Sequence, residues 1–247
     1  MIRLTLIGIG TGHPDHLTLQ GARALQEADL VLIPRKGEAK EDLAHLRLAL
    51  LERHRPGGAV AAFDLPLREA AGGYLAGVER WHDAIAGVWR AEVARHLPQG
   101  GTVALLVWGD PSLYDSSLRI AARLDWPARV IPGITAIQAL CAAHAIPLNS
   151  LGSPVLITTG RQLRDHGWPA ECDRVLVMLD GACAFAELPP EGLFIWWGAY
   201  LGMPEEVLEA GPLADTAPRI RAARAAARAA HGWIMDCYLL AREAPHR

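Results

Sequence analysis

The sequence predicts an α/β protein folded as two α/β domains, and three observations lead to that prediction. Short apolar runs alternate with amphipathic segments through the first half of the chain. Turn-forming residues gather at 147–154 and interrupt this pattern. Strand-like runs then follow with less helix between them. Because 247 residues accommodate two small domains, we expect one domain over residues 1–150 and a second, mixed α/β domain over residues 151–247.

The first half is typical of a parallel sheet with helical crossovers. Residues 3–9 form a continuous apolar, β-branched run that stops at glycines, as a buried parallel strand does. Thr18 is placed to cap the first helix, and Pro34 marks the expected end of the second strand. Strand–helix alternation at this spacing implies right-handed crossovers. The expected strands are 3–9, 30–33, 59–63, 102–108 and 129–131, and the expected helices are 18–28, 41–53, 74–97, one from about 113, and 134–145.

The second half contains more strand for its length, which predicts a smaller mixed sheet. We expect strands at 155–159, 174–178, 193–197 and 233–240. An Ala/Arg-rich helix is expected at about 217–230. Its arginines are interpreted as a solvated helix face: Arg219, Arg221, Arg224 and Arg228.

Composition excludes several classes of protein. A formal net charge of −3 argues against a nucleic-acid partner, which calls for a basic surface. No apolar stretch approaches 18 residues, and the first residues lack a signal-peptide pattern, so we expect no membrane span and a cytoplasmic protein. The four cysteines are widely spaced, which favours neither a disulfide framework nor a zinc site. His13 and His16 lack a third ligand, so no metal is expected.

Three loops are expected at the carboxyl edge of the first sheet, where ligands bind in open parallel sheets. They cover residues 8–15, 107–114 and 130–138. The glycines of the first loop do not fit the spacing of a dinucleotide-binding turn. Taken singly, each loop is also explained as a structural turn, with Asp110 capping the helix that follows.

Together these loops carry a resemblance to a known family. The segments Ile7-Gly-Ile-Gly-Thr-Gly12, Trp108-Gly-Asp-Pro-Ser-Leu-Tyr-Asp-Ser116 and Ile195-Trp-Trp-Gly-Ala-Tyr-Leu-Gly202 resemble tetrapyrrole methyltransferases of the cobalamin pathway. Further matching segments are 36–40, 154–161, 177–181 and 232–238, so the resemblance covers nearly the whole chain. Thr11 stands where many relatives have proline, and His13 where they have aspartate.

The resemblance implies two α/β domains of tetrapyrrole methylase type with the active site in a trough between them, and a homodimer. It also implies S-adenosylmethionine as the methyl donor and a tetrapyrrole as the substrate. The activity implied is methylation of precorrin-5 at ring carbon C1 with release of acetate. The cofactor-binding residues implied in this chain are Thr11, Trp108, Gly109, Asp110, Leu113, Thr135, Ala136, Met178, Leu179, Gly198 and Ala199.

The chemistry implied by this resemblance suggests further candidates. Methyl transfer from a sulfonium needs alignment more than a catalytic side chain, whereas removal of an acetyl group needs a base and a hydrogen-bond donor. The candidates for that step are Asp110, Tyr114 and His82, with Asp180 and Tyr200 as further polar groups. A substrate with many carboxylates calls for basic partners, for which the candidates are Arg35, Lys36, Lys40 and Arg161.

Two other interpretations stay open at this point. The chain could be a different methyltransferase of the same family, or a ligand-binding module without catalysis. Conversion of the donor together with a mass gain on the pigment would favour an enzyme, and acetate release would identify the deacetylating branch.

Overall fold

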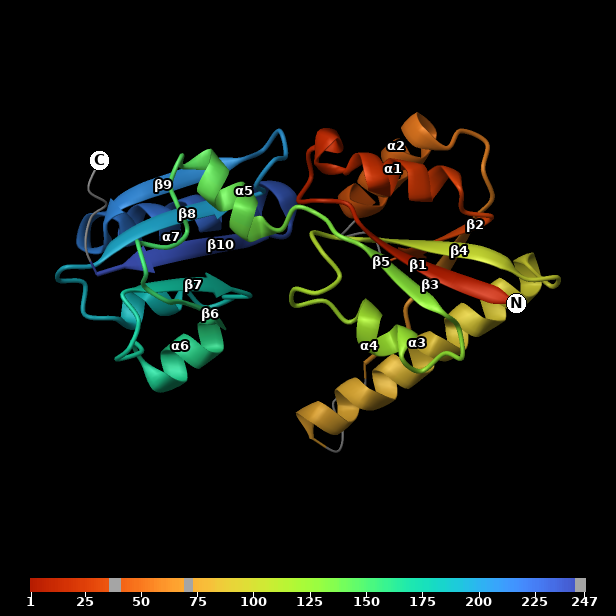
Figure 1. The fold of residues 1–247 in the computed structure, drawn as a ribbon. Helices are drawn as coiled ribbons and strands as arrows, with labels where there is room; N and C mark the ends of the chain where they lie inside the picture. Colours follow the sequence, from red (N-terminus) through yellow and green to blue (C-terminus); the bar gives the residue numbers. More distant parts are fainter. Residues whose placement is uncertain (36–40, 69–72, 243–247) are drawn as a thin grey trace. The chain divides into compact units, whose positions relative to one another are not determined.

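The computed structural model describes residues 1–35, 41–68 and 73–242, and the chain divides into two compact units (Figure 1). The first unit comprises Met1–Thr135 and the second Ala136–Arg247. The division between the units falls after Thr135, whereas the sequence predicts a boundary after residue 150.

The first unit is built on a five-stranded sheet in which every pairing is parallel. The strand order is β3-β2-β4-β1-β5. Its members are β1 (Ile2–Gly8), β2 (Leu30–Arg35), β3 (Val60–Asp64), β4 (Gly101–Val107) and β5 (Ala128–Ile131). The parallel sheet predicted from the alternating pattern is therefore confirmed.

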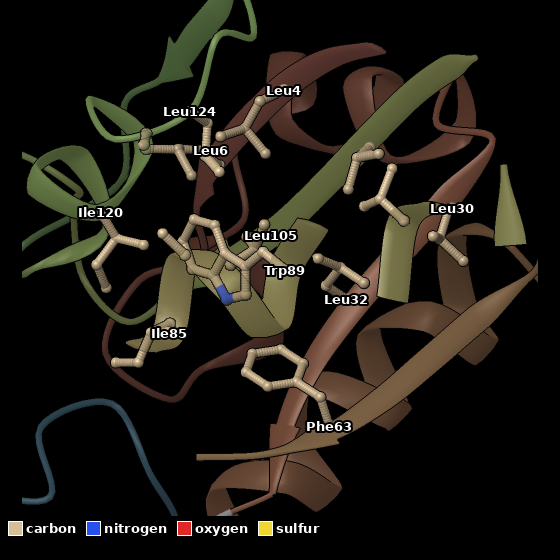
Figure 2. Packing of buried hydrophobic residues seen from close by; sticks show 14 of the residues in the cluster. Leu4, Leu6, Leu30, Leu32, Phe63, Ile85, Trp89, Leu105, Ile120 and Leu124 are labelled. Atoms are coloured by element: carbon tan, nitrogen blue, oxygen red, sulfur yellow. The ribbon is translucent and has the colours of Figure 1, made fainter. Parts of the chain in front are cut away.

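Helices cover both faces of this sheet. On one face lie α1 (Leu19–Gln26) and α2 (Glu41–His54), and on the other α3 (Tyr74–His96) and α4 (Ser117–Ala121) (Figure 1). Alternate strand residues pack toward each layer. Trp89 of α3 packs with Leu6, Leu32 and Phe63 in one core (Figure 2), while the opposite core includes residues of α1 and α2. The Thr18 hydroxyl accepts the Gly21 amide at 3.0 Å, which confirms the predicted cap of α1.

Two elements of the first unit differ from the sequence prediction. Strand β2 continues through Pro34, because its pairing with β4 ends at Leu32 and only β3 lies beside it there. A proline, which lacks an amide proton, is tolerated where one side of a strand is unpaired. Helix α4 begins at Ser117 rather than near 113, since residues 110–116 form turns instead.

The second unit contains a mixed sheet of order β6-β7-β10-β8-β9. Only β6 and β7 pair in parallel. Its strands are β6 (Val155–Thr159), β7 (Arg174–Met178), β8 (Phe194–Ala199), β9 (Val207–Pro212) and β10 (Asp236–Ala241). Its helices are α5 (Ala136–Ala143), α6 (Gly160–His166) and α7 (Leu213–His231), and the 3-10 turns are η1 (Pro14–His16) in the first unit and η3 (Ala184–Glu187) in the second. The mixed sheet is as predicted, but β9 is additional.

The helix α5 and the segment after it belong to the second unit, for identifiable reasons. The His144 ring nitrogen Nε2 is hydrogen-bonded to the Trp197 carbonyl at 3.0 Å. The buried Arg174 side chain donates to the carbonyls of Pro147 and Leu148, at 2.7 and 3.1 Å. Pro147 and Leu148, the first turn residues of the linker predicted at 147–154, are thus bonded to a strand of the second sheet.

Among the residues described, no helix is both long and apolar enough to cross a membrane.

Candidate functional site

The structure brings the three predicted loops together at the carboxyl edge of the first sheet. The Gly109 amide donates to the Gly10 carbonyl at 2.8 Å, and the Gly10 amide donates back to the Gly109 carbonyl at 3.3 Å. Gly133 of the third loop donates its amide to the Asp110 carboxylate at 2.8 Å. Loops that follow β1, β4 and β5 are therefore in direct contact.

Glycine is required where these loops meet because backbone packs on backbone. A Cβ atom on Gly8 would lie 2.6 Å from the Gly133 nitrogen and 2.8 Å from the Gly109 oxygen. One on Gly133 would overlap the Gly109 carbonyl. Close backbone approach of this kind is a regular use of glycine, so the spacing that fails as a dinucleotide turn has a different structural basis.

Asp110 fastens the second loop to the third. One carboxylate oxygen accepts the Ser112 amide at 2.8 Å and the Ser112 hydroxyl, and the other accepts the Gly133 amide. Burial by itself would raise the pKa of Asp110, but the hydrogen bonds from Ser112 and Gly133 favour the ionised form and leave the pKa below its ordinary value. Asp110 is thus a buried anion whose two oxygens are both engaged.

The first loop uses its polar residues internally. Thr11 is 4% exposed, and its hydroxyl is hydrogen-bonded to His16 Nδ1 at 3.2 Å. The His13 ring accepts the Asp15 amide at 3.1 Å, which caps η1. Within the part of the chain that the structure describes, no group of three or more His, Cys, Asp or Glu side chains could hold a metal ion.

Tyr114 is the exposed polar side chain among the second-loop candidates. It is 43% exposed and has a φ of 50°. A bulky residue in this left-handed region is strained, and such strain clusters at functional sites. Partial burial raises the pKa of Tyr114, so its phenol stays protonated and can donate a hydrogen bond near neutral pH. Its neighbours Trp108 and Leu113 are half-buried, as are Thr135 and Ala136.

The second unit aligns its two predicted cofactor segments across β10. Met178 at the end of β7 and Gly198 near the end of β8 both pair with Cys237 of β10, one on each side. Leu179, next along from β7, is 65% exposed with a φ of 53°. Ala199 is fully buried. Of these residues, Leu179 therefore presents its side chain to solvent.

Two further polar candidates for the deacetylation step are engaged inside the second unit. Asp180 is 6% exposed, and its carboxylate accepts hydrogen bonds from the amides of Ala182 and Ala184 and from the Tyr238 hydroxyl. The buried Tyr200 hydroxyl donates to the Trp233 carbonyl at 2.5 Å. Both groups hold local structure in this conformation.

The remaining predicted residues are scattered. His82 lies on α3 and is only 1% exposed. Arg35 is exposed and makes two hydrogen bonds to the Asp64 carboxylate, at 3.1 and 3.4 Å. Lys36 and Lys40 fall outside the described residues. Arg161 lies on the exposed surface of α6.

One interpretation of the sequence is wrong. Arg224 was expected on a solvated face of the Ala/Arg helix, but it is 5% exposed and ion-paired with Asp236. Its helix position alone did not distinguish it from its neighbours, because the partner lies in β10. Arg219 also has a partner, Glu209 of β9, although it stays largely exposed.

Four residues that were not among the predicted ones contact Asp110 or Asp180: Ser112, Gly133, Tyr238 and Arg224. For Ser112 a signal was present, since a serine two residues after an aspartate is typical of a side-chain-to-backbone turn. Gly133 was recognised only as a turn residue. Tyr238 and Arg224 act through contacts between elements distant in sequence, which periodicity does not reveal.

The fold and the loops at the carboxyl edge of the first sheet define a class of protein. It is an α/β chain of two units in which glycine-rich loops meet at the carboxyl ends of parallel strands. The model of the tetrapyrrole (corrin/porphyrin) methylases matches residues 3–217. The chain belongs to that family.

Individual relatives agree with this assignment. The chain is 45% identical over 253 aligned positions to a precorrin-6A synthase [deacetylating] of Sinorhizobium sp, covering 99% of this chain and 97% of the relative. The crystal structure of a cobalamin synthesis related protein from Corynebacterium diphtheriae has a TM-score of 0.86 and 38% identity, covering 99% of this chain and 100% of that one. A Thermus thermophilus uroporphyrin-III C-methyl transferase complexed with S-adenosylhomocysteine shares the fold, with a TM-score of 0.58, 22% identity and coverage of 97% and 92%.

Proposed function

We propose that this chain is an S-adenosylmethionine-dependent C-methyltransferase that converts precorrin-5 to precorrin-6A in aerobic cobalamin biosynthesis. The reaction methylates ring carbon C1 and releases acetate. The observation that carries this proposal is the 45% identity to a precorrin-6A synthase [deacetylating] over nearly the full length of both chains. A relative matching only one region would support the family but not the particular reaction.

The described residues fit a methyl donor of this kind. S-adenosylmethionine supplies an electrophilic methyl group on a sulfonium, and the protein has to align it and exclude water. In the first unit, the contacts proposed are Thr11, Trp108, Gly109, Asp110, Leu113 and Thr135. In the second unit, they are Ala136, Met178, Leu179, Gly198 and Ala199. The half-buried Trp108 and Leu113 and the exposed Leu179 offer apolar surface, and glycine backbone allows close approach.

For the loss of the acetyl group, Tyr114 is the best-supported candidate. Attack of water on an acetyl carbonyl develops negative charge on oxygen, which a positioned donor stabilises. The Tyr114 hydroxyl stays protonated and the residue is 43% exposed, which suits it to that role. Asp110 is engaged at both oxygens, which supports a role in holding the loops, and the buried position of His82 supports a structural role.

Basic residues are proposed to bind the substrate carboxylates. Arg35 and Arg161 are exposed, and Lys36 and Lys40 follow Arg35 in the sequence. The ion pair of Arg35 with Asp64 is solvent-exposed, and such pairs contribute little free energy. A substrate carboxylate can therefore replace Asp64 at modest cost.

We further propose that the protein is cytoplasmic and assembles as a homodimer. Apolar side chains on the edge strands support self-association, since Val130 of β5 and Leu156 and Ile157 of β6 are each more than a third exposed. Light scattering should give twice the mass of one chain, and a monomer across micromolar concentrations would contradict this.

The activity is tested by incubating the purified protein with methyl-labelled S-adenosylmethionine and precorrin-5. We expect one label on the pigment, one S-adenosylhomocysteine and one acetate per turnover. Uroporphyrinogen III and precorrin-2 serve as alternative substrates in parallel reactions. Methylation of one of these in place of precorrin-5 would assign the chain to another branch of the family, and donor binding without turnover would indicate a module without catalysis.

A further inference from the structure

A single buried arginine connects the two segments of the second unit that we propose as donor contacts. Arg224 lies on α7 and is 5% exposed. One guanidinium nitrogen, Nη2, donates to the Asp180 carbonyl at 2.9 Å, immediately after Leu179. The other, Nη1, pairs with the Asp236 carboxylate. The planar fork of the guanidinium makes both contacts at once.

Asp236 extends the connection to β8. It is the first residue of β10, and its carboxylate also accepts the Trp197 indole proton at 2.7 Å. Trp197 directly precedes Gly198 and Ala199. Arg224 is thereby linked through one carboxylate to the end of β8 and through one carbonyl to the end of β7.

The residue after Leu179 is fixed from its side chain as well. The Asp180 carboxylate accepts the amides of Ala182 at 3.0 Å and Ala184 at 2.7 Å, and the Tyr238 hydroxyl at 2.6 Å. Gly160 packs against this carboxyl group so closely that a Cβ atom would overlap it. Backbone and side chain of Asp180 are therefore both held.

Such restraint matches the strained conformation of its neighbour. Leu179 has a φ of 53°, which is unfavourable for leucine, yet 65% of it is exposed, so burial does not compensate the strain. Strained residues persist when the surrounding structure determines their conformation. The hydrogen bonds made by Asp180 hold the backbone next to Leu179 and so keep Leu179 in its strained conformation.

We infer that Arg224 and Asp236 are positioning residues for the methyl donor, because they hold residues 178–180 and 197–199 in one arrangement. This inference rests on the proposed function, since these segments are donor contacts only by that proposal. A merely structural ion pair would stabilise the unit without affecting the donor site in molecules that remain folded.

The decisive variants disrupt the contacts that hold these two segments. Arg224→Lys keeps a cation for Asp236 but cannot form both branches of the fork. Arg224→Met combined with Asp236→Asn removes both charges, so no unpaired buried charge remains. Tyr238→Phe removes the hydroxyl that donates a hydrogen bond to Asp180 and keeps the aromatic ring. Arg219→Met, on the exposed part of the same helix, is the matched control.

Circular dichroism and the thermal midpoint establish that each variant is folded, and calorimetry measures its Kd for S-adenosylhomocysteine. We expect the Kd to rise at least tenfold in Arg224→Lys and in the double variant, and about threefold in Tyr238→Phe. The KM for S-adenosylmethionine should rise in parallel, while the KM for precorrin-5 stays within twofold of wild type. Arg219→Met should match wild type in all of these.

The outcomes distinguish this inference from the proposed function. Should Arg224→Lys fail to fold, the double variant and Tyr238→Phe decide. Folded variants that bind S-adenosylhomocysteine within twofold of wild type overturn the positioning role alone. A wild-type protein that does not bind S-adenosylhomocysteine overturns the proposed function, and this inference with it.

Discussion

Asp110 shows how one buried carboxylate organises loops from two strands. Its oxygens accept hydrogen bonds from Ser112 and Gly133, which belong to different loops. We expect Asp110→Asn to lower the free energy of unfolding by about 1–3 kcal/mol. The NH2 group of asparagine would replace one carboxylate oxygen, so its protons would face the backbone amide proton of Ser112 or of Gly133. Chemical denaturation at pH 7 measures this, and the variant should also bind S-adenosylhomocysteine more weakly.

The same residue predicts a dependence of stability on pH. The pKa of Asp110 is lower in the folded chain than its ordinary value, so the unfolded chain binds more protons as the solution is acidified. The stability that Asp110 contributes is complete above the ordinary aspartate pKa of about 3.9 and is lost as the pH falls through the folded value. Asp110→Asn should lack this component. An identical loss on acidification in both proteins would contradict the assignment.

Tyr114 provides a separate test of the deacetylation step. Phenylalanine preserves the ring of this residue and removes its hydroxyl. In a single turnover of Tyr114→Phe, we expect methyl transfer to persist and acetate release to slow by about 10²–10³-fold, as for the loss of one oxyanion donor. Rapid quench with mass analysis of the pigment follows both steps. Equal slowing of both steps would argue against a dedicated donor, and unchanged acetate release would remove Tyr114 from the mechanism.

His82 predicts a different dependence on acid. It is 1% exposed, and neither ring nitrogen has a hydrogen-bond partner within the described residues. Burial lowers its pKa, and the nearby cation of Arg123 lowers it further. Above the ordinary histidine pKa of about 6.5, His82 is neutral in both the folded and the unfolded chain, so its lowered pKa does not affect stability. Below that pH the unfolded chain binds the proton first, and the free energy of unfolding therefore falls.

We therefore expect His82→Leu to lose less stability than wild type between pH 6.5 and 5, by at most about 2 kcal/mol, which is the limit for the uptake of one proton over this pH range. Urea denaturation across this pH range makes the comparison. Because His82 lies inside the helix layer, the variant should retain methyl transfer at pH 7.5. Loss of that activity in a folded variant would return His82 to the catalytic candidates.

At the scale of elements, the ends of β1, β4 and β5 depend on contact between glycine backbones. We expect Gly8→Ala to destabilise the first unit by at least about 2 kcal/mol, since its Cβ meets backbone atoms that cannot rotate away. Gly87→Ala is the matched control: it lies within α3 with nothing within 4 Å of a Cβ, so alanine should stabilise the helix by about 0.5–1 kcal/mol. Denaturation midpoints of the two variants should move in opposite directions.

The elements also show what local pattern could and could not predict. The buried strands of the first sheet were predictable because parallel strands are apolar on both faces. Edge strand β9 was missed because it contains Glu209, Gly211 and Pro212, and its stabilising contacts come from β8. The ion pair of Arg224 was missed for a related reason, since its partner Asp236 belongs to β10.

The candidate site was likewise predictable only in the features that local sequence determines. The loops after β1, β4 and β5 could be placed at one edge because strand direction alone determines it. Which side chains are exposed there could not be predicted: Tyr114 is exposed, whereas Asp110 is buried and accepts a hydrogen bond from Gly133 of another loop. Sequence therefore located the loops, and tertiary packing decided the role of each side chain.

At the scale of the whole molecule, two units with different sheets each present proposed donor contacts at strand ends. In the first unit these follow parallel strands, and in the second they lie on both sides of β10. If both units bind one donor molecule, its binding free energy must stabilise both. At 100 times its Kd, a ligand stabilises the folded state by about 2.7 kcal/mol.

Amide hydrogen exchange tests whether that stabilisation is shared. On addition of S-adenosylhomocysteine, we expect slower exchange in residues 109–113 and Thr135 of the first unit and in Ala136, 178–182 and 198–200 of the second. If one molecule binds both units, both sets should follow the same ligand concentration, whereas amides of β3 should change little. Protection confined to one unit, or two different midpoints, would mean that the units do not bind one donor together and would restrict the donor contacts to the unit that responds.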